Sequence, residues 1–278
     1  MLRFARNDGD PAYSSIILCL VFLTAGLFPC GGIAAGEDHE AVSVQSIDEK
    51  SCDDMRRHHV LNGGFSSCGR LRLVRFSYIN FRGETGNTGA IVVLDAVANQ
   101  VLLLFEDLRR ARFPIEKANL MNDYDGNDDR SMNDNNTSSF NDRNIAGSTR
   151  ISLHAYGAAI DINPKINPFV VRGRNKIVKP KSGAAYLDRT AKKPGMAEPV
   201  KAIFADHGFT VWGGDWRNPT DYQHFQLRRD LAGKLIALPA EKAREYFESF
   251  VQSYRKCVAE AGEPRAEAAA KCGAKALN

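Results

Sequence analysis

Several patterns that mark common protein classes are missing from this sequence. The apolar run at residues 16–28 has 13 residues, whereas a membrane-spanning helix needs about 20. The formal net charge is only +4 and no long lysine or arginine tract occurs, so charge gives no reason to expect nucleic acid as a partner. An HExxH motif is also absent, which excludes the common helical zinc-peptidase layout.

The first residues have the order that is typical of a secretory signal. Arg3 and Arg6 precede the apolar run, and the small-residue stretch "GGIAAG" follows it. This order predicts an exported protein cleaved near Ala35 or Gly36, with no stable membrane span after processing. An uncleaved anchor is the alternative.

Cysteine occurs six times, and never at zinc-finger spacing, so thiolate metal ligands are not expected. Removal of the signal leaves an even set of four, which in an exported protein predicts two disulfides rather than buried free thiols. Three connectivities are possible. We favour the sequence-local pairs, Cys52 with Cys68 and Cys257 with Cys272.

The composition is that of a globular protein, with 44% hydrophobic and 25% charged residues. We expect one domain with extensions. The expected divisions are a signal peptide (1–36), an N-terminal extension (37–70), the main domain (71–238) and a C-terminal helical extension (239–278).

Hydrophobic periodicity predicts a mixture of strands and helices. Apolar residues at helical spacing are found at 96–112, 198–209 and beyond 239, where residues 262–264 interrupt the pattern. The stretch "AIVVLDAV" indicates a second strand or the lead into a helix. Other expected strands are residues 71–81, "AIDIN", "TVWGGDW" and "HFQL".

Residues 119–144 are crowded with asparagine and aspartate, which is typical of a disordered loop. Gly126 stands at the wrong position for a calcium loop. A long loop in a compact domain is often functional. The segment is therefore interpreted either as a wall of a binding site or as a plain surface loop.

Two short stretches carry the chemistry. His154 and Asp161 lie seven residues apart in "SLHAYGAAIDINP", and His224 lies in "DYQHFQ". Each residue alone is explained by a structural role. Together they form the three-ligand set of a catalytic zinc ion, which leaves a fourth position for water.

The pattern "SxHxxGxAxDIN", followed by "WGGDW" and "DYQHFQ", resembles the VanY-type D-alanyl-D-alanine carboxypeptidase and L-alanyl-D-glutamate endopeptidase family of zinc peptidases. It is most similar to the endopeptidase branch, and the resemblance runs over residues 76–227. It implies an α+β fold of the hedgehog and D,D-peptidase type, in which a small antiparallel sheet carries the zinc site and helices pack on one side.

The resemblance also implies roles for individual residues. His154, Asp161 and His224 would bind Zn²⁺, Asp221 would be the catalytic carboxylate, and Arg143 would face the scissile carbonyl. Further candidates are Ser152 and Tyr156, as substrate contacts or supports of the metal ligands, and Asp215, which could orient a ligand histidine unless "WGGDW" only forms two core tryptophans around a turn. The histidines at 39, 58, 59 and 207 are interpreted as surface or structural residues.

These observations predict an exported peptidase of the periplasm or cell envelope that hydrolyses peptidoglycan stem peptides, at an L-alanyl-D-glutamate or similar bond. A D-alanyl-D-alanine carboxypeptidase is the close alternative. A zinc-stabilised module that binds the cell wall without cutting it is a third. The presence of both Asp221 and Arg143 favours an enzyme, because a binding module has no need of a proton-transfer carboxylate.

Overall fold

The computed structural model describes residues 42–63, 67–262 and 265–276. The predicted signal segment, Cys19, Cys30 and His39 lie outside these residues. In chain order the elements are β1 (Ser43–Ser46), α1 (Glu49–Arg57), β2 (Leu71–Tyr78), β3 (Asn87–Leu94), α2 (Ala98–Arg110), α3 (Asp128–Asn133), β4 (Ala159–Asp161), β5 (Phe169–Val171), β6 (Ile177–Lys179), α4 (Lys201–Asp206), β7 (Val211–Trp212), β8 (Thr220–Asp221), β9 (His224–Gln226), α5 (Arg229–Ala237), α6 (Ala240–Glu260) and α7 (Arg265–Lys275).

The strands form three antiparallel sheets of three strands each, in the orders β1-β2-β3, β4-β9-β7 and β6-β5-β8. The α+β class is confirmed, whereas the single small sheet that we expected is divided into separate short sheets. In "AIVVLDAV" the residues AIVVL end β3 and DAV forms a 3-10 turn that leads directly into α2, so each of the two interpretations holds for part of the stretch. The second and third sheets carry three of the candidate site residues, because β4, β8 and β9 contain Asp161, Asp221 and His224.

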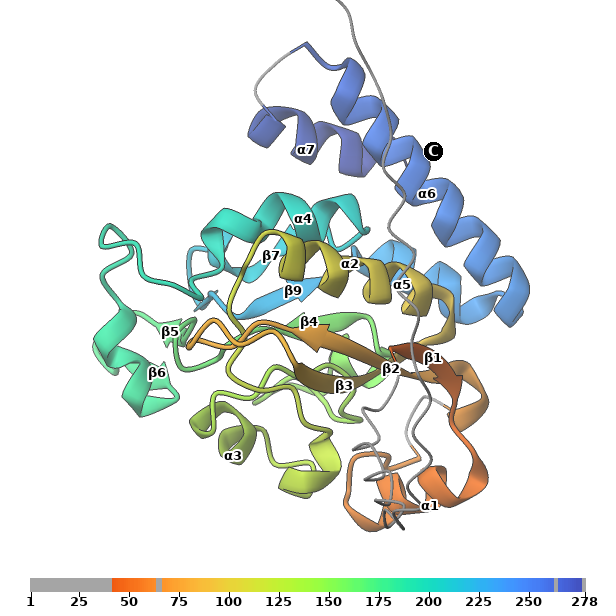
Figure 1. The fold of residues 1–278 in the computed structure, drawn as a ribbon, viewed down its shortest axis with the longest axis horizontal. Coiled ribbons are helices and arrows are strands. Elements are labelled where there is room, and N and C mark those ends of the chain that lie inside the picture. Colours follow the sequence, from red (N-terminus) through yellow and green to blue (C-terminus); the bar gives the residue numbers. More distant parts are fainter. Residues whose placement is uncertain (1–41, 64–66, 263–264, 277–278) are drawn as a thin grey trace, which may run out of the picture. The chain divides into compact units, whose positions relative to one another are not determined.

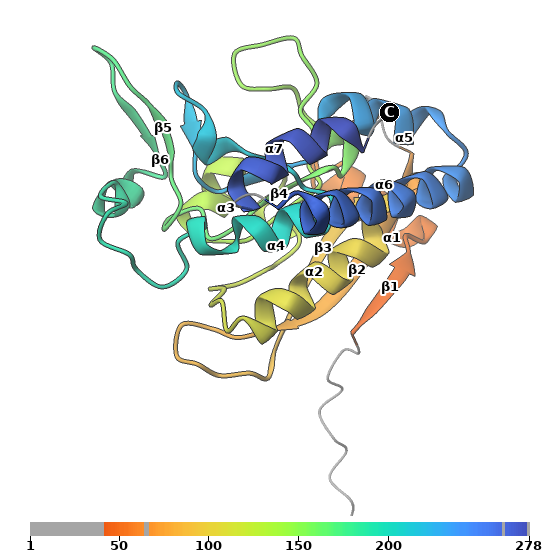
Figure 2. The ribbon, with the colours of Figure 1, turned by 90° about the horizontal axis from the view of Figure 1, so that it is seen from above.

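Helices α2, α4, α5 and α6 lie on one side of the strands, and α3 lies on the other (Figure 1). The expectation that helices pack on one side only is therefore wrong for α3. Figure 2 shows α2, α4 and α6 crossing the same face of the molecule. Helix α2 buries an apolar stripe, and its Phe105 ring stacks on Phe76 of β2 with 3.6 Å between the centroids. Among the helices in the described part of the chain, none combines the length and the apolar character needed to cross a bilayer.

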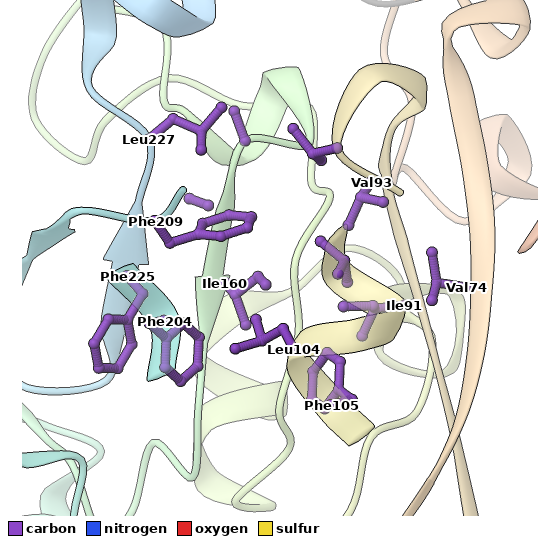
Figure 3. Packing of buried hydrophobic residues seen from close by; sticks show 14 of the residues in the cluster. Val74, Ile91, Val93, Leu104, Phe105, Ile160, Phe204, Phe209, Phe225 and Leu227 are labelled. Atoms are coloured by element: carbon purple, nitrogen blue, oxygen red, sulfur yellow. The ribbon is translucent and has the colours of Figure 1, made fainter. Parts of the chain in front are cut away.

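The main hydrophobic core lies between these helices and the strands. Figure 3 shows Ile160 of β4 with Phe204 and Phe225 on one side and Leu104 on the other. The rings of Phe204 and Phe225 are stacked, with centroids 3.7 Å apart. Because successive side chains of a strand point to opposite faces, burial of Ile160 in this core directs Asp161 away from it.

Both ends of the described chain are attached to the central part. Strand β1 pairs with β2, and a disulfide joins Cys52 to Cys68. A second disulfide joins Cys257 of α6 to Cys272 of α7. Both predicted disulfide pairs are thus confirmed, as is the prediction of a helical tail. Helix α5 was not expected from the sequence, because its buried stripe consists only of Leu231, Ala232 and Leu235.

Residues 119–144 form an ordered segment, so the expectation of disorder from composition is wrong. The side chain of Asn127 accepts a hydrogen bond from Arg130 N at 3.0 Å and begins α3. The buried amide of Asn136 binds both the N–H and the carbonyl of Asn119, at 2.7 and 3.1 Å. Asparagine side chains replace the backbone partners that an irregular segment lacks. The composition that suggested disorder is what holds the segment in place.

Candidate metal centre and active site

His154 lies on a short 3-10 turn, residues His154–Tyr156, that packs tightly against β3. The turn ends at Gly157, which has a φ of +63° and whose carbonyl accepts a hydrogen bond from Leu94 N at 3.0 Å. A Cβ atom at Gly157 would lie 2.7 Å from the carbonyl carbon of Val93. Glycine is therefore required both for the left-handed conformation and for the close approach. The small residues after His154 in the sequence serve to place this turn.

Asp161 and His224 face each other across the β4–β9 pair, where they are direct partners in the antiparallel register. Asp161 Oδ1 is 2.9 Å from His224 Nδ1 and 3.4 Å from His154 Nε2, and the two histidine nitrogens are 3.1 Å apart. All three ligand atoms lie within 4.8 Å of one another. The structure thus brings together the three residues that the sequence predicted as zinc ligands.

The other ring nitrogen of each histidine is held by an oxygen atom. His154 Nδ1 donates to the carbonyl of Ser139 at 2.6 Å, and His224 Nε2 donates to Gln226 Oε1 at 2.8 Å. These bonds leave Nε2 of His154 and Nδ1 of His224 directed at Asp161. Two imidazoles with such outer supports and one carboxylate are the donors that a catalytic zinc ion uses. The residues therefore fit zinc.

Charge in the group also favours a cation. Burial alone would raise the pKa of Asp161, but the charge of His154 and hydrogen bonds from both histidines hold that pKa below its usual value. Burial opposes protonation of His224, whereas its hydrogen bond to Asp161 raises the pKa of this histidine to about 8. Both effects show that the group has a negative centre at Asp161 that positive charge stabilises.

Gln226 was not identified from the sequence as part of the site. Its signal is the spacing in "HFQ", since residues two apart on a strand share a face. We expect Gln226→Leu to weaken zinc affinity by about 10- to 100-fold, because the outer nitrogen of His224 loses its acceptor. Gln226→Glu keeps an acceptor and should stay close to wild type. Competition with a chelator of known affinity measures the effect, and the exposed Gln252→Leu in α6 is the matched control. An unchanged affinity in Gln226→Leu would contradict the role.

Asp221 ends β8, in the sheet next to the one that holds β4 and β9. It lines the same cavity as the candidate metal ligands His154, Asp161 and His224, called the metal group below. Burial raises the pKa of Asp221 to about 6, and the nearby Asp161 carboxylate adds to the effect. Gln223 Nε2 donates to Asp221 Oδ1 at 3.1 Å. A partly buried carboxyl group with a pKa close to neutrality can accept and release a proton at working pH.

The "WGGDW" motif packs against Asp221 and forms part of the site wall. A Cβ atom at Gly213 would lie 2.5 Å from the carbonyl oxygen of Asp221 and 2.9 Å from its Cβ. Trp212 is buried and donates to the carbonyl of Tyr222 at 2.9 Å. Trp216 is 37% exposed and its ring lies 5.5 Å from that of His224, so the interpretation of two core tryptophans holds only for Trp212.

The expectation that Asp215 orients a ligand histidine is not met. Its carboxylate is largely exposed and pairs with Lys201. Both outer histidine nitrogens already have other partners, in Ser139 and Gln226. Within the motif it is Gly213, and not Asp215, that packs closely against Asp221. The two residues are close in sequence, so the sequence could not tell which of them affects the site.

A cavity of about 630 Å³ opens over the metal group. Arg143 and Ser152 both line it, and Ser152 Oγ also accepts a hydrogen bond from His154 N at 3.2 Å. Tyr156 is partly buried and packs against the main hydrophobic core. One wall comes from the asparagine-rich segment, which favours the binding-site interpretation of that segment over a plain surface loop. From this segment the cavity is lined by Asn127, Asp128, Asp129, Ser131, Met132, Ser138 and Arg143.

Arg143 is held at the cavity wall by Asp128, with which it forms an ion pair. Asn141 donates to the same carboxylate at 2.8 Å. The sequence offered no reason to expect a calcium loop here, and Asp128 was not identified from it as the partner of Arg143. The pair is formed within the asparagine-rich segment itself, so that segment positions a candidate catalytic side chain.

Comparison with known families finds a similarity over the segment that contains most of this site. A model of the family described as D-alanyl-D-alanine carboxypeptidase matches residues 146–227. The match contains His154, Asp161, Asp221 and His224 but not Arg143. No curated protein and no solved structure was found to match the chain. The matched segment, which is less than a third of the chain, is thus similar to a zinc peptidase family that acts on peptidoglycan.

Proposed function

We propose that this protein is an exported, zinc-dependent peptidase that hydrolyses the peptide stems of peptidoglycan. The observation that carries the proposal is the convergence of His154, Asp161 and His224 beside the partly buried carboxyl of Asp221, in one cavity. The match to a carboxypeptidase family over the same residues supports it. Two disulfides are in keeping with an oxidising compartment such as the periplasm.

Each side chain has a role that its position supports. Bound zinc would supply a Lewis acid that lowers the pKa of a water molecule and polarises the scissile carbonyl. Asp221 takes the proton that the water loses and delivers it to the nitrogen of the leaving amine. Arg143 donates to the carbonyl oxygen as negative charge develops on it. Ser152 steadies the turn that bears His154.

The bond that we propose is L-alanyl-D-glutamate or a similar L,D bond, because "HAYGAAIDINP", "NPF" and "WGGDW" resemble the endopeptidase branch. The description of the matched family favours a second candidate, D-alanyl-D-alanine carboxypeptidase activity. The basic side chains of Lys179 and Arg229 line the cavity. They would suit the carboxylates that a stem peptide carries in either case.

Digestion of purified muropeptides by the zinc-loaded protein, with identification of the fragments by mass spectrometry, tests the proposal. Release of the stem from its first L-alanine would support the endopeptidase, and release of a single terminal D-alanine would support the carboxypeptidase. Binding of muropeptides without any cleavage would instead indicate a cell-wall binding module. If the protein neither binds nor cleaves muropeptides, the proposed substrate is refuted.

Gly213 offers a test of how Asp221 is placed. In Gly213→Ala the new methyl group would displace Asp221, and we expect turnover of the cleaved stem peptide to fall by about 10- to 100-fold. Zinc content should stay at the wild-type level, since no metal ligand is altered. Gly233→Ala, in α5 and with no atom within 4 Å of the added carbon, is the matched control. Wild-type turnover in Gly213→Ala would show that this contact does not position the carboxylate.

A further inference from the structure

Gln223 is a buried side chain whose hydrogen-bonding capacity is only half used. It is 2% exposed and lines the cavity beside His224. Its amide nitrogen makes two contacts, one to Asp221 Oδ1 at 3.1 Å and one to the thioether sulfur of Met132 at 3.5 Å. The amide oxygen has no hydrogen-bond partner among the described residues. The two N–H groups are thus occupied and the single acceptor is left over.

The orientation of this amide follows from its neighbours. A carboxylate accepts hydrogen bonds and offers none, so Asp221 selects the nitrogen of Gln223 rather than the oxygen. The sulfur of Met132 is likewise an acceptor, although a weak one. Both neighbours therefore leave the oxygen for a donor that no described residue supplies. Buried acceptors without a partner are rare in folded proteins and are costly to maintain.

The position of the free oxygen identifies the missing donor. Asp221, in the proposed function, delivers a proton to the nitrogen of the scissile amide. The oxygen of Gln223 belongs to the same planar amide group whose nitrogen holds Asp221, so it lies within a few bond lengths of that carboxylate. This oxygen is buried in the unliganded cavity, so a small shift of the surrounding side chains must expose it to a peptide. The N–H of a scissile amide in reach of Asp221 is the nearest donor that a substrate offers to it.

We propose that Gln223 is a substrate-recognition residue that accepts a hydrogen bond from the N–H of the scissile amide while its own nitrogen holds Asp221. This inference rests on the proposed function. Gln223 thereby selects a secondary amide at the cleaved position and sets the direction from which Asp221 approaches the nitrogen. Gln223 itself transfers no proton and forms no covalent bond.

The first test compares turnover. Gln223→Met keeps the length of the side chain and removes both the donor and the acceptor. We expect kcat/KM for the cleaved stem peptide to fall by at least about tenfold, with zinc content and thermal midpoint at the wild-type level. Gln252→Met, at an exposed position of α6, is the control for the substitution. Wild-type kcat/KM in Gln223→Met would overturn the inference.

A binding measurement separates recognition from a merely structural role. It uses the zinc-loaded Asp221→Asn protein and two versions of the stem peptide, one with the ordinary scissile N–H and one methylated at that nitrogen. We expect methylation to weaken binding by about tenfold when Gln223 is present, and to have a several-fold smaller effect in the Asp221→Asn, Gln223→Met double variant. An equal effect of methylation in both proteins would refute the hydrogen bond.

Failure of the proposed function gives a different result. If the wild-type protein neither binds nor cleaves stem peptides, the substrate assignment is wrong and the role of Gln223 falls with it. If the wild type cleaves them and methylation has the same effect with and without Gln223, only the role of Gln223 is wrong.

Discussion

Replacement of Asp221 by asparagine should lower turnover of stem peptides by about 100-fold or more, with zinc retained. An asparagine side chain still accepts the hydrogen bond from Gln223, but it cannot carry the proton from water to the leaving amine, and general acid-base catalysis is commonly worth about this factor. Burial disfavours the Asp221 carboxylate, as its raised pKa shows, so the neutral asparagine should not lower the thermal midpoint.

Zinc content, thermal midpoint and peptide hydrolysis should be measured on the same preparations of Asp221→Asn and wild type. If Asp221 only supported the turn after Pro219, its loss would reduce stability and leave the rate per zinc-loaded molecule nearly unchanged. Equal turnover per mole of zinc-loaded protein would therefore refute the catalytic assignment. Zinc loss from Asp221→Asn would instead place this residue among the groups that hold the metal.

The second large effect is expected at His224. His224→Ala removes one of three ligand atoms from a group whose members lie within 4.8 Å of one another, and it leaves Asp161 without its cross-strand partner. We expect about one zinc per chain in wild type, and loss of both metal and activity in the variant.

Metal analysis after extensive dialysis checks this expectation. The control is His58→Ala, since the side chain of His58 is partly exposed and pairs with Asp125 away from the cavity. That control should retain about one zinc and full activity. Full zinc retention in His224→Ala would remove His224 from the metal group, whereas zinc loss in His58→Ala would place a second ion elsewhere on the chain.

The candidate metal ligands could be predicted from the sequence because their chemistry and their local spacing are both unusual. His154 and Asp161 come from one short segment whose small residues include Gly157, and the structure shows that this glycine lets the turn approach β3. Disulfide pairing was also predictable, because each pair closes a loop of only 16 or 15 residues. In each case, residues close in sequence determine the geometry.

Composition was a poor guide to the asparagine-rich segment, residues 119–144. An asparagine side chain can hydrogen-bond to water in a disordered loop or to backbone groups in an ordered one, and the amino-acid type is the same in both cases. The outcome depends on neighbours such as Lys117, whose carbonyl accepts from Thr137 N at 2.9 Å, and Asp161, which exchanges two backbone hydrogen bonds with Ser138. These partners are known only once the chain has folded.

The chemistry available to this protein can be read from its residues alone: two imidazoles and a carboxylate for a metal, and a further carboxylate, Asp221, three residues before His224. The groups that support this chemistry became known from the folded chain. The β4–β9 register sets Asp161 opposite His224, and the same fold gives Gln226 and Ser139 to the histidines, Asp128 to Arg143, and Gln223 to Asp221. A side chain's ability to bind a metal depends on its own chemical type. Its hydrogen-bond partner depends on which residue lies within hydrogen-bonding distance, and most of these pairs join segments that are brought together only by burial of the common core.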